Sequence, residues 1–367
     1  MRLLENKYEL ITLEYSHFDE IIDLFKICGM NKDTSFDEYK RVLQWGLINN
    51  PFCDDRVIGH IIKYKNQIIA SAYYIYLPFK FGDFSGIIPA IGSLCVHPDH
   101  QGVLGFIFSK EILKRDDYHI MVGCHFSKIA GFIWKKFGAI ECPHSNLSFD
   151  GILSLNKKID NAISNKNKII GNISKLGLNV LLKPFFYYKG FQEIKCPLTT
   201  LTIIYPFNFE TSHEEVINEL CEHNHSNLNT GILRTADYLR WRYYKHPSKD
   251  QYHIFSVKNK DNTYIGLAIL QLLPDTNEVR ICELLYMPTV KNIEKELIYA
   301  VIMIAKKIGG VTIATRVICQ ELIQVWREIK LNEKAKQYMQ FLILPKPYIT
   351  RPEDLTIMHS YGEFKII

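Results

Sequence analysis

Alternating and continuous runs of apolar residues divide the chain into two similar series of predicted elements. In the first series, after a helical start, we expect strands at 57–65, 67–77, 90–96 and 119–126 and helices at 104–115 and 128–138. In the second, again after a helical start, we expect strands at 252–258, 264–273, 279–286 and 311–317 and helices at 292–309 and 319–330. The pattern predicts an α/β fold (α+β, mixed sheets) that is built twice.

A spaced motif supports this internal duplication. Leu-x-Trp-x5-Pro occurs at residues 43–51 and again at 239–247, with its tryptophans at Trp45 and Trp241. The other two tryptophans of the chain, Trp134 and Trp326, lie at corresponding positions in the last helix of each series. Two similar cores that share large anchors explain matched tryptophans without giving them a catalytic role.

The segment between the two series, residues 148–195, is rich in Asn and Lys and then turns aromatic. We expect it to be helical and to close the first domain, with the boundary near Tyr205 and Pro206. The expected domains are therefore residues 1–205 and 206–367.

A turn with two glycines follows the predicted strand 90–96. Pro98 ends the strand, and Gly102 and Gly105 remove side chains, so that free backbone N–H groups at the start of the next helix can face an anion. A tight turn without a ligand is the alternative. A dinucleotide-binding fold would need Gly-x-Gly-x-x-Gly with an acidic residue about 20 positions later, and that spacing is absent.

The order of elements and this turn resemble the GNAT superfamily of acyl-CoA N-acyltransferases. The family's turn has Arg or Gln, two residues, Gly, one residue, and then Gly or Ala. Gln101 matches the first position, and Leu104 stands where the central glycine is expected unless one residue is inserted and Gly105 takes that role. Residues 123–139 resemble the strand and helix that close the family's cofactor half.

The resemblance implies acyl-CoA as co-substrate, either acetyl-CoA or a longer or hydroxylated acyl-CoA, and no metal. In the family the cofactor strand bulges away from its neighbour, so that pantetheine can pair with its backbone, and the turn holds the pyrophosphate. The expected cofactor-binding residues are Leu94, Cys95, Val96, Gln101, Gly102, Val103, Leu104, Gly105 and Phe106.

The second series lacks a glycine in its turn, at residues 286–296. The bulky side chains of this turn and the acidic Glu296 would obstruct or repel a pyrophosphate; the bulky residues are Val290, Ile293 and Glu294. We expect one acyl-CoA site, in the first domain, with the second domain serving as support or as the acceptor-binding wall.

Acyl transfer to an amine needs a proton acceptor and donors for the developing oxyanion. His125, at the end of a predicted strand, is the expected base, with Ser127 orienting thiol or water and His97 as the second choice. A structural role for His125 is the alternative. The family's usual tyrosine acid is replaced by Trp134, so a dedicated acid is in doubt, and we expect Cys95 and Cys124 to be small core residues.

Among tandem GNAT proteins, the chain looks most similar to bacterial sugar-nucleotide N-acyltransferases of the dTDP-3-amino-3,6-dideoxyhexose type. This implies acylation of a nucleotide-linked deoxyaminosugar for a surface polysaccharide such as lipopolysaccharide O-antigen. A peptide or peptidoglycan-precursor amine and a catalytically silent acyl-CoA-binding module are the alternatives. The expected substrate-binding residues are Arg234, Trp241, Arg242, Tyr244, Glu283 and Tyr286.

Composition adds limits on partners and compartment. The net charge of +5 over 367 residues, with no clustered basic face, gives no indication of nucleic-acid binding. No apolar run reaches the ~18 residues of a membrane span. Nine cysteines without a CxxC pair favour reduced thiols in a cytoplasm and argue against a metal site. Because a duplicated chain supplies its own interface, we expect a monomer.

Overall fold

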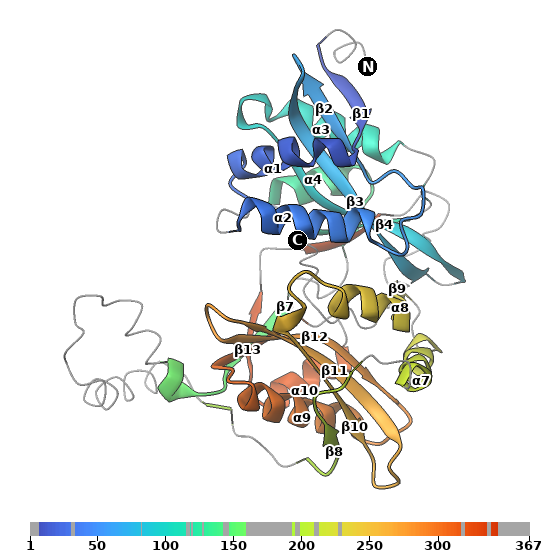
Figure 1. The fold of residues 1–367 in the computed structure, drawn as a ribbon, viewed down its shortest axis with the longest axis vertical. Coiled ribbons are helices and arrows are strands. Elements are labelled where there is room, and N and C mark those ends of the chain that lie inside the picture. Colours follow the sequence, from blue (N-terminus) through green and yellow to red (C-terminus); the bar gives the residue numbers. More distant parts are fainter. Residues whose placement is uncertain are drawn as a thin grey trace, which may run out of the picture.

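The computed structural model describes most of the chain. The described residues are 7–30, 34–81, 83–114, 118, 120–126, 128–141, 147–158, 193–194, 199–208, 213–226, 230–316, 320–335 and 339–343. They form two mixed sheets with helices packed on them (Figure 1). We call the elements from β1 to β7 the first repeat and those from β8 to β15 the second repeat.

The first repeat begins with a short strand and helices and continues through four longer strands. Its elements are β1 (Glu9–Thr12), η1 (Tyr15–His17), α1 (Phe18–Ile27), α2 (Phe36–Leu43), the π-helix η2 (Gln44–Ile48), β2 (Gly59–Tyr64), β3 (Gln67–Phe81), β4 (Phe84–Val96), η3 (Pro98–His100), α3 (Val103–Leu113), β5 (Met121–Phe126), α4 (Lys128–Lys136), β6 (Ile140–Glu141) and β7 (Leu147–Ile152).

The second repeat has the same order, with one additional strand. Its elements are β8 (Thr202–Ile204), α7 (Glu214–Ser226), β9 (Thr230–Ile232), α8 (Ala236–Leu239), the π-helix η5 (Arg240–Tyr244), η6 (Lys249–Gln251), β10 (Tyr252–Lys258), β11 (Tyr264–Leu273), β12 (Glu278–Tyr286), α9 (Ile293–Lys307), β13 (Thr312–Arg316), α10 (Gln320–Glu328), β14 (Asn332–Ala335) and β15 (Met339–Ile343). The predicted series of strands and helices agrees with these bounds within a few residues, except that β3 and β4 form a longer hairpin than expected.

The two sheets exchange one strand each. The first has the order β1-β2-β3-β4-β5-β15-β6, and the second has the order β8-β10-β11-β12-β13-β7-β14. Strand β7 therefore lies in the second sheet, antiparallel to β13 and β14, and β15 lies in the first, antiparallel to β5 and β6. Figure 1 shows green β7 among the orange strands of the lower sheet. Each repeat thus contributes one strand to the sheet of the other, as in a two-fold symmetric pair.

This exchange corrects the expectation for residues 148–195. We predicted a helical segment that closes the first domain, but Leu147–Ile152 is a strand of the second sheet; residues 159–192 lie outside the described part. A cut between 205 and 206 falls just after β8, the first strand of the second repeat. It does not separate the two sheets, because β7 and β8 both lie before the cut and belong to the second sheet.

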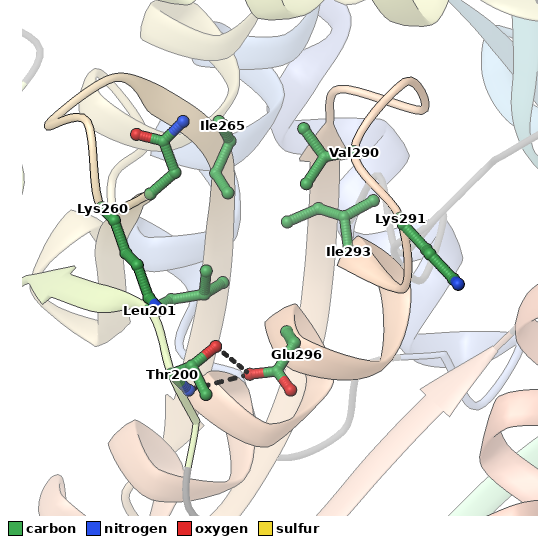
Figure 2. A pocket seen from close by; sticks show the side chains of 9 residues that line it. Thr200, Leu201, Lys260, Ile265, Val290, Lys291, Ile293 and Glu296 are labelled. Atoms are coloured by element: carbon green, nitrogen blue, oxygen red, sulfur yellow. Dashed lines mark hydrogen bonds between the residues drawn. The ribbon is translucent and has the colours of Figure 1, made fainter.

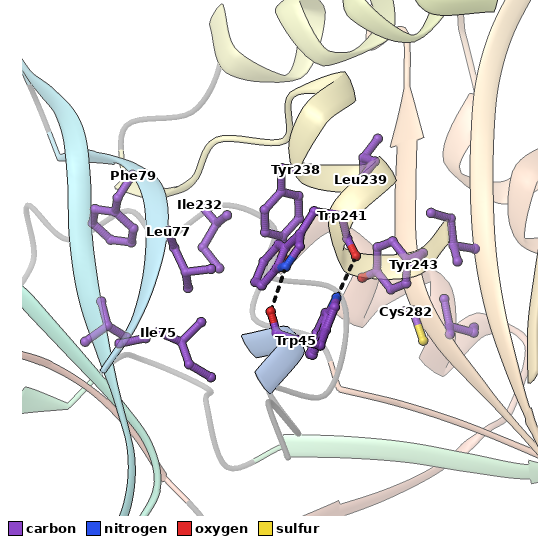
Figure 3. Close-up of a cluster of buried hydrophobic side chains, with 14 of the residues drawn as sticks. Trp45, Ile75, Leu77, Phe79, Ile232, Tyr238, Leu239, Trp241, Tyr243 and Cys282 are labelled. Atoms are coloured by element: carbon purple, nitrogen blue, oxygen red, sulfur yellow. Dashed lines mark hydrogen bonds between the residues drawn. The ribbon is translucent and has the colours of Figure 1, made fainter. Parts of the chain in front are cut away.

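The two π-helices meet at the centre of the molecule. Trp45 and Trp241 stack with ring centroids 4.8 Å apart and an interplanar angle of 15°. The indole of Trp45 donates to the carbonyl of Trp241 at 3.0 Å, and the indole of Trp241 donates to the carbonyl of Trp45 at 3.3 Å (Figure 3). Each tryptophan donates to the backbone of the other, and such reciprocal contacts are typical of a two-fold interface. The motif that indicated the duplication thus forms the contact between its halves.

Among the described residues, an additional strand pairing joins the repeats on one side of the molecule, without a counterpart on the other. Strand β9 pairs antiparallel with the end of β3, from Phe79 opposite Ile232 to Phe81 opposite Thr230. Lys80 Nζ also donates to the carbonyl of His225 at 3.3 Å. The long β3–β4 hairpin of the first repeat therefore extends onto the second repeat.

Candidate functional site

The end of β4 is bulged and separates from β5. Ser71 of β3 pairs with Cys95, but Tyr73 pairs with Gly92, so β4 carries one extra residue between these pairs. Within the bulge Ser93 has a φ of 43°, and its hydroxyl lies 2.8 Å from the hydroxyl of buried Tyr73. The parallel pairing of β4 with β5 is confined to Ala90 and Ile91. The last five residues of β4 therefore run past β5 without pairing to it, which is the bulge and splay that we predicted.

The turn after β4 leads into an open helix N-terminus. Gly102 precedes α3 with a φ of 90°, a conformation that favours glycine. Gly105 has ordinary helical geometry, and a Cβ there would meet only Val96 Cγ2 at 3.8 Å. The glycine at 105 is therefore not required by packing within the described protein. Leu104 is buried while Val103 and Phe106 are exposed, so Gly105 and not Leu104 opens the first turn of the helix.

Side chains around the turn hold its backbone in place. Gln101 Nε2 donates to the carbonyl of Val96 at 3.4 Å, and the Asp99 N–H donates to His97 Nδ1 at 3.3 Å. On the other side, His100 lies against Tyr64, with ring centroids 5.1 Å apart. The contact with Asp99 engages Nδ1 of His97, our second choice of base, within the turn.

Two thiols lie beside the end of β4. Cys28, at the end of α1, donates to the carbonyl of Val96 at 3.4 Å. A hydrogen bond with the buried Cys95 thiol lowers the pKa of Cys28 although partial burial opposes the shift, and the same bond together with burial raises the pKa of Cys95. Cys95 is a core residue, as predicted; the Cys124 side chain lies outside the described residues.

The predicted base lies on the splayed strand β5. Phe126 pairs with Met339 of β15 and Cys124 pairs with Gln340, so His125 is the extra residue of a second bulge. The side chain of His125, and Ser127 entirely, lie outside the described residues. On α4, which follows, Trp134 is fully buried at the position where a tyrosine acid was considered.

The corresponding turn of the second repeat is closed by protein groups. Asn292, before α9, has a φ of 60°, and Glu296 lies in the first turn of the helix. The Glu296 carboxylate accepts hydrogen bonds from the Thr200 N–H and the Thr199 hydroxyl, both at 2.9 Å. Figure 2 shows this carboxylate in a pocket of about 190 Å³ between β11 and α9. A carboxylate at this helix N-terminus takes the place that an anionic ligand would need.

Comparison with solved structures identifies the fold. No protein-family model matches the sequence, and no curated protein matches it either. Saccharomyces cerevisiae N-myristoyltransferase with bound myristoyl-CoA superposes with a TM-score of 0.57 at 12% identity, covering 92% of this chain and 83% of that one. A probable N-acyltransferase from Enterococcus faecalis V583 gives 0.58 at 10% identity, covering 92% and 73%. A GCN5-related N-acetyltransferase from Kribbella flavida gives 0.55 at 10% identity, covering 92% and 72%.

The fold is a tandem GNAT fold. The bulged β4, the splayed β5 and the turn before α3 thus occur in a chain whose fold is similar to these solved structures over 92% of its length.

In the second GNAT repeat, β12 is also bulged and separates from β13, but buried protein side chains occupy the space beside it. Ile269 pairs with Glu283 and Leu270 pairs with Ile281, so β12 also carries an extra residue, and its pairing with β13 ends at Arg280. Glu283, 1% exposed, accepts hydrogen bonds from Arg234 Nε at 3.1 Å and from the Tyr243 hydroxyl at 2.8 Å. Burial raises the pKa of Glu283, while Arg234 and Tyr243 oppose the shift. An internal ion pair thus occupies the second opening.

These positions correct most of the predicted substrate-binding set. Arg234 and Glu283 are buried partners of each other, Trp241 is stacked on Trp45, and Tyr286 is 4% exposed. The basic and aromatic residues that suggested a ligand instead pack and pair within the protein. Tyr244 is exposed, and no described contact connects it with the other predicted substrate residues.

Arg242, the remaining member of that set, lines a cavity between the repeats. The cavity has a volume of about 250 Å³ and lies between α2 of the first repeat and the second sheet. Arg242 lies over the Trp45 ring, 5.4 Å from its centroid. The sequence cluster around residues 240–244 indicated this region, but the contribution of α2 and of Arg280 could not be recognised without the fold.

Within the described ranges, no group of three or more His, Cys, Asp or Glu side chains is placed to hold a metal ion. In the same residues, none of the helices is both long enough and apolar enough to cross a membrane.

Proposed function

We propose that this chain is an acyl-CoA-dependent N-acyltransferase that binds acyl-CoA in its first repeat. The observation that carries the proposal is the contrast between the two turns. The first has Gly102 and Gly105 and an open helix N-terminus, whereas the second has the Glu296 carboxylate bonded in the same place. The solved structures with the same fold are an N-myristoyltransferase with bound myristoyl-CoA, a GCN5-related N-acetyltransferase and a probable N-acyltransferase.

The cofactor is proposed to lie along β4 and over the start of α3. Pantetheine amides would pair with the backbone of Leu94, Cys95 and Val96, because this edge of β4 runs past β5 unpaired. The pyrophosphate would lie on the backbone N–H groups of residues 102–106, where the helix dipole favours a negative charge.

The proposed reaction is direct attack of an amine on the thioester. The amine nitrogen forms a bond to the carbonyl carbon, the C–S bond breaks, and CoA leaves as a thiolate that takes up a proton. Backbone N–H groups near Cys95 and Val96 would stabilise the oxyanion. We propose His125 as the acceptor of the amine proton, with Ser127 beside it; a dedicated acid is not part of the proposal, since Trp134 is buried in the place considered for one.

The acceptor is proposed to be the amino group of a nucleotide-linked deoxyaminosugar of surface-polysaccharide biosynthesis. The support for this class is the sequence resemblance, and the transferred acyl group is left open between acetyl and longer or hydroxylated chains. We further propose that the protein works as a cytoplasmic monomer, since the repeats already bury a two-fold contact against each other. A dimer found by light scattering would overturn the proposal that the protein is a monomer.

The test is the Gly105→Ala variant. A Cβ at 105 fits the protein, and alanine is favoured over glycine in helices by about 0.5–1 kcal/mol, so stability should be kept or increased. The same methyl group would stand where the pyrophosphate approaches, so CoA affinity measured by calorimetry should fall at least tenfold, together with acyl transfer measured as thiol release.

The matched control is Lys295→Ala at the corresponding position of α9, where Lys295 is an exposed partner of Glu328. This variant should bind CoA as the wild type does. Unchanged CoA affinity in Gly105→Ala, or absence of CoA binding to the wild type, would overturn the proposed function.

A further inference from the structure

The cavity between the repeats has the composition of an anion site. Its lining includes Arg242, Arg280, His246 and Gln271 from the second repeat and Glu38 and Tyr39 from α2 of the first. We propose that this cavity binds an oxyanion group, phosphate or carboxylate, of the acceptor molecule. The inference rests on the proposed N-acyltransferase function, and it names the chemistry of the acceptor that the second repeat would recognise.

The two-fold relation of the repeats allows this cavity to be compared with the equivalent space in the other half. On the opposite side of the stacked tryptophans, the related space is filled by apolar side chains, among them Ile75, Leu77 and Tyr238 (Figure 3). Three polar positions of the cavity lack polar side chains in the first repeat, where the matched motifs and strand pairs place Gly46 for Arg242, Ile75 for Gln271 and Ala90 for Arg280. Two guanidinium groups and an amide therefore replace a hydrophobic contact.

The charges of the lining favour an anion. Arg242 is 7% exposed, so its charge acts in a medium of low polarity, where electrostatic attraction is stronger than in water. Arg280 adds a second guanidinium, bonded to Glu278 at 2.9 Å. Burial and the nearby Arg242 lower the pKa of His246 to about 3, so this ring is neutral at pH 7. Glu38 is the one carboxylate among the lining residues, and a planar guanidinium suits bidentate binding of phosphate or carboxylate.

The cavity is connected to the proposed reaction centre by aromatic packing. Tyr39 lines the cavity and packs on Phe25, which in turn contacts the ring of Tyr73. Tyr73 bonds Ser93 in the bulge of β4, directly before Leu94 to Val96, the residues along which pantetheine is proposed to lie. An acceptor anchored by its anion in this cavity would lie next to the helix layer that covers the bulge.

The experiment measures anion binding with the first site already occupied. The full chain is saturated with CoA, so that the turn before α3 is filled, and is then titrated calorimetrically with inorganic pyrophosphate, with dTDP and with the dipeptide Ala-Glu. Binding of dTDP and pyrophosphate would indicate a diphosphate-bearing acceptor, and binding of the dipeptide alone would indicate a carboxylate. If none of the three binds, the inference is wrong.

Two variants locate the site. Arg280→Gln removes a partly exposed charge, and Gln271→Ile restores the residue of the first repeat; each should weaken anion binding at least tenfold while CoA affinity stays unchanged. The control Arg327→Gln changes an exposed arginine of α10 and should bind the anion as the wild type does. Equal anion affinity in Arg280→Gln and wild type would overturn the inference. If the wild type does not bind CoA, the proposed function is wrong instead.

Discussion

The two repeats have the same backbone architecture, but they differ in the side chains at the bulged strand and at the turn that follows it. Both have a π-helix with a tryptophan as its second residue, a bulge in β4 or β12, and a splay of that strand from β5 or β13. In the first repeat the turn beyond the bulge is open at Gly105. In the second, the Glu296 carboxylate occupies the turn and Glu283 with Arg234 occupies the bulge. The same backbone is therefore open in one repeat and closed by a few side chains in the other.

The contact between the repeats gives the largest expected effect. Truncation of a buried tryptophan costs about 3–5 kcal/mol, and it also leaves the partner's carbonyl without its indole donor. We expect Trp45→Ala and Trp241→Ala to lower the free energy of unfolding by similar amounts in urea denaturation. Because the rings stack on each other, the double variant should lose less than the two single losses together.

The exposed Tyr244 of the same π-helix provides a control. Tyr244→Ala should change stability by less than about 0.5 kcal/mol. Additive losses in the double variant would show that the two tryptophans contribute separately, and the two-fold contact would then carry no coupling.

The pH dependence of stability tests a second difference between the repeats. His246 Nδ1 accepts from the N–H two residues later, at 2.9 Å, just as Asn50 Oδ1 does in the first repeat. Since the pKa of His246 is lowered to about 3 in the folded protein, only the unfolded chain takes up this proton between pH 6.5 and pH 3. Stability is therefore lost as the pH falls through that range.

The variant His246→Asn gives the second repeat the residue of the first. Between pH 7 and pH 4.5 it should lose about 2 kcal/mol less stability than the wild type, measured by urea denaturation at each pH. If the two stability curves stay parallel, burial of a neutral His246 is not a source of acid sensitivity.

Thiol reactivity gives the smallest expected effect. At pH 8 Cys28 should be alkylated by iodoacetamide several-fold faster than Cys221, because its pKa is lowered by the Cys95 thiol while burial raises the pKa of Cys221 to about 12. Peptide mass spectrometry follows both rates. Saturating CoA should slow alkylation of Cys28, which bonds to Val96 at the end of β4, and should not change Cys221; equal rates with and without CoA would contradict this placement.

The individual strands and helices could be predicted from the sequence better than the pairing of the strands within the sheets. Apolar periodicity identified β2 to β5 and β10 to β13, since each strand carries its own alternation. The sheet in which β7 or β15 lies depends on pairing with residues more than a hundred positions away, and no local sequence pattern contains that information. The turn at Gly102 and Gly105 was recognisable because glycine marks it.

The surroundings of the predicted substrate residues were not predictable from the sequence for a different reason. Arg234, Trp241 and Glu283 have the residue types of a ligand site, and the same types suit an internal ion pair and a stacked core. Which of the two is formed depends on burial, and burial depends on the tertiary fold. Glu38 and Arg280 face one cavity from elements distant in sequence, so composition could not bring them together.

The exchange of β7 and β15 has a consequence for the order of events during synthesis. The edge of β5 next to β15 stays unpaired until residues 339–343 have left the ribosome, and β7 waits for β13 at residues 312–316. Neither sheet can be completed while the first repeat alone has been translated. The nascent chain therefore carries exposed strand edges for most of its synthesis, and the two repeats are expected to finish folding together.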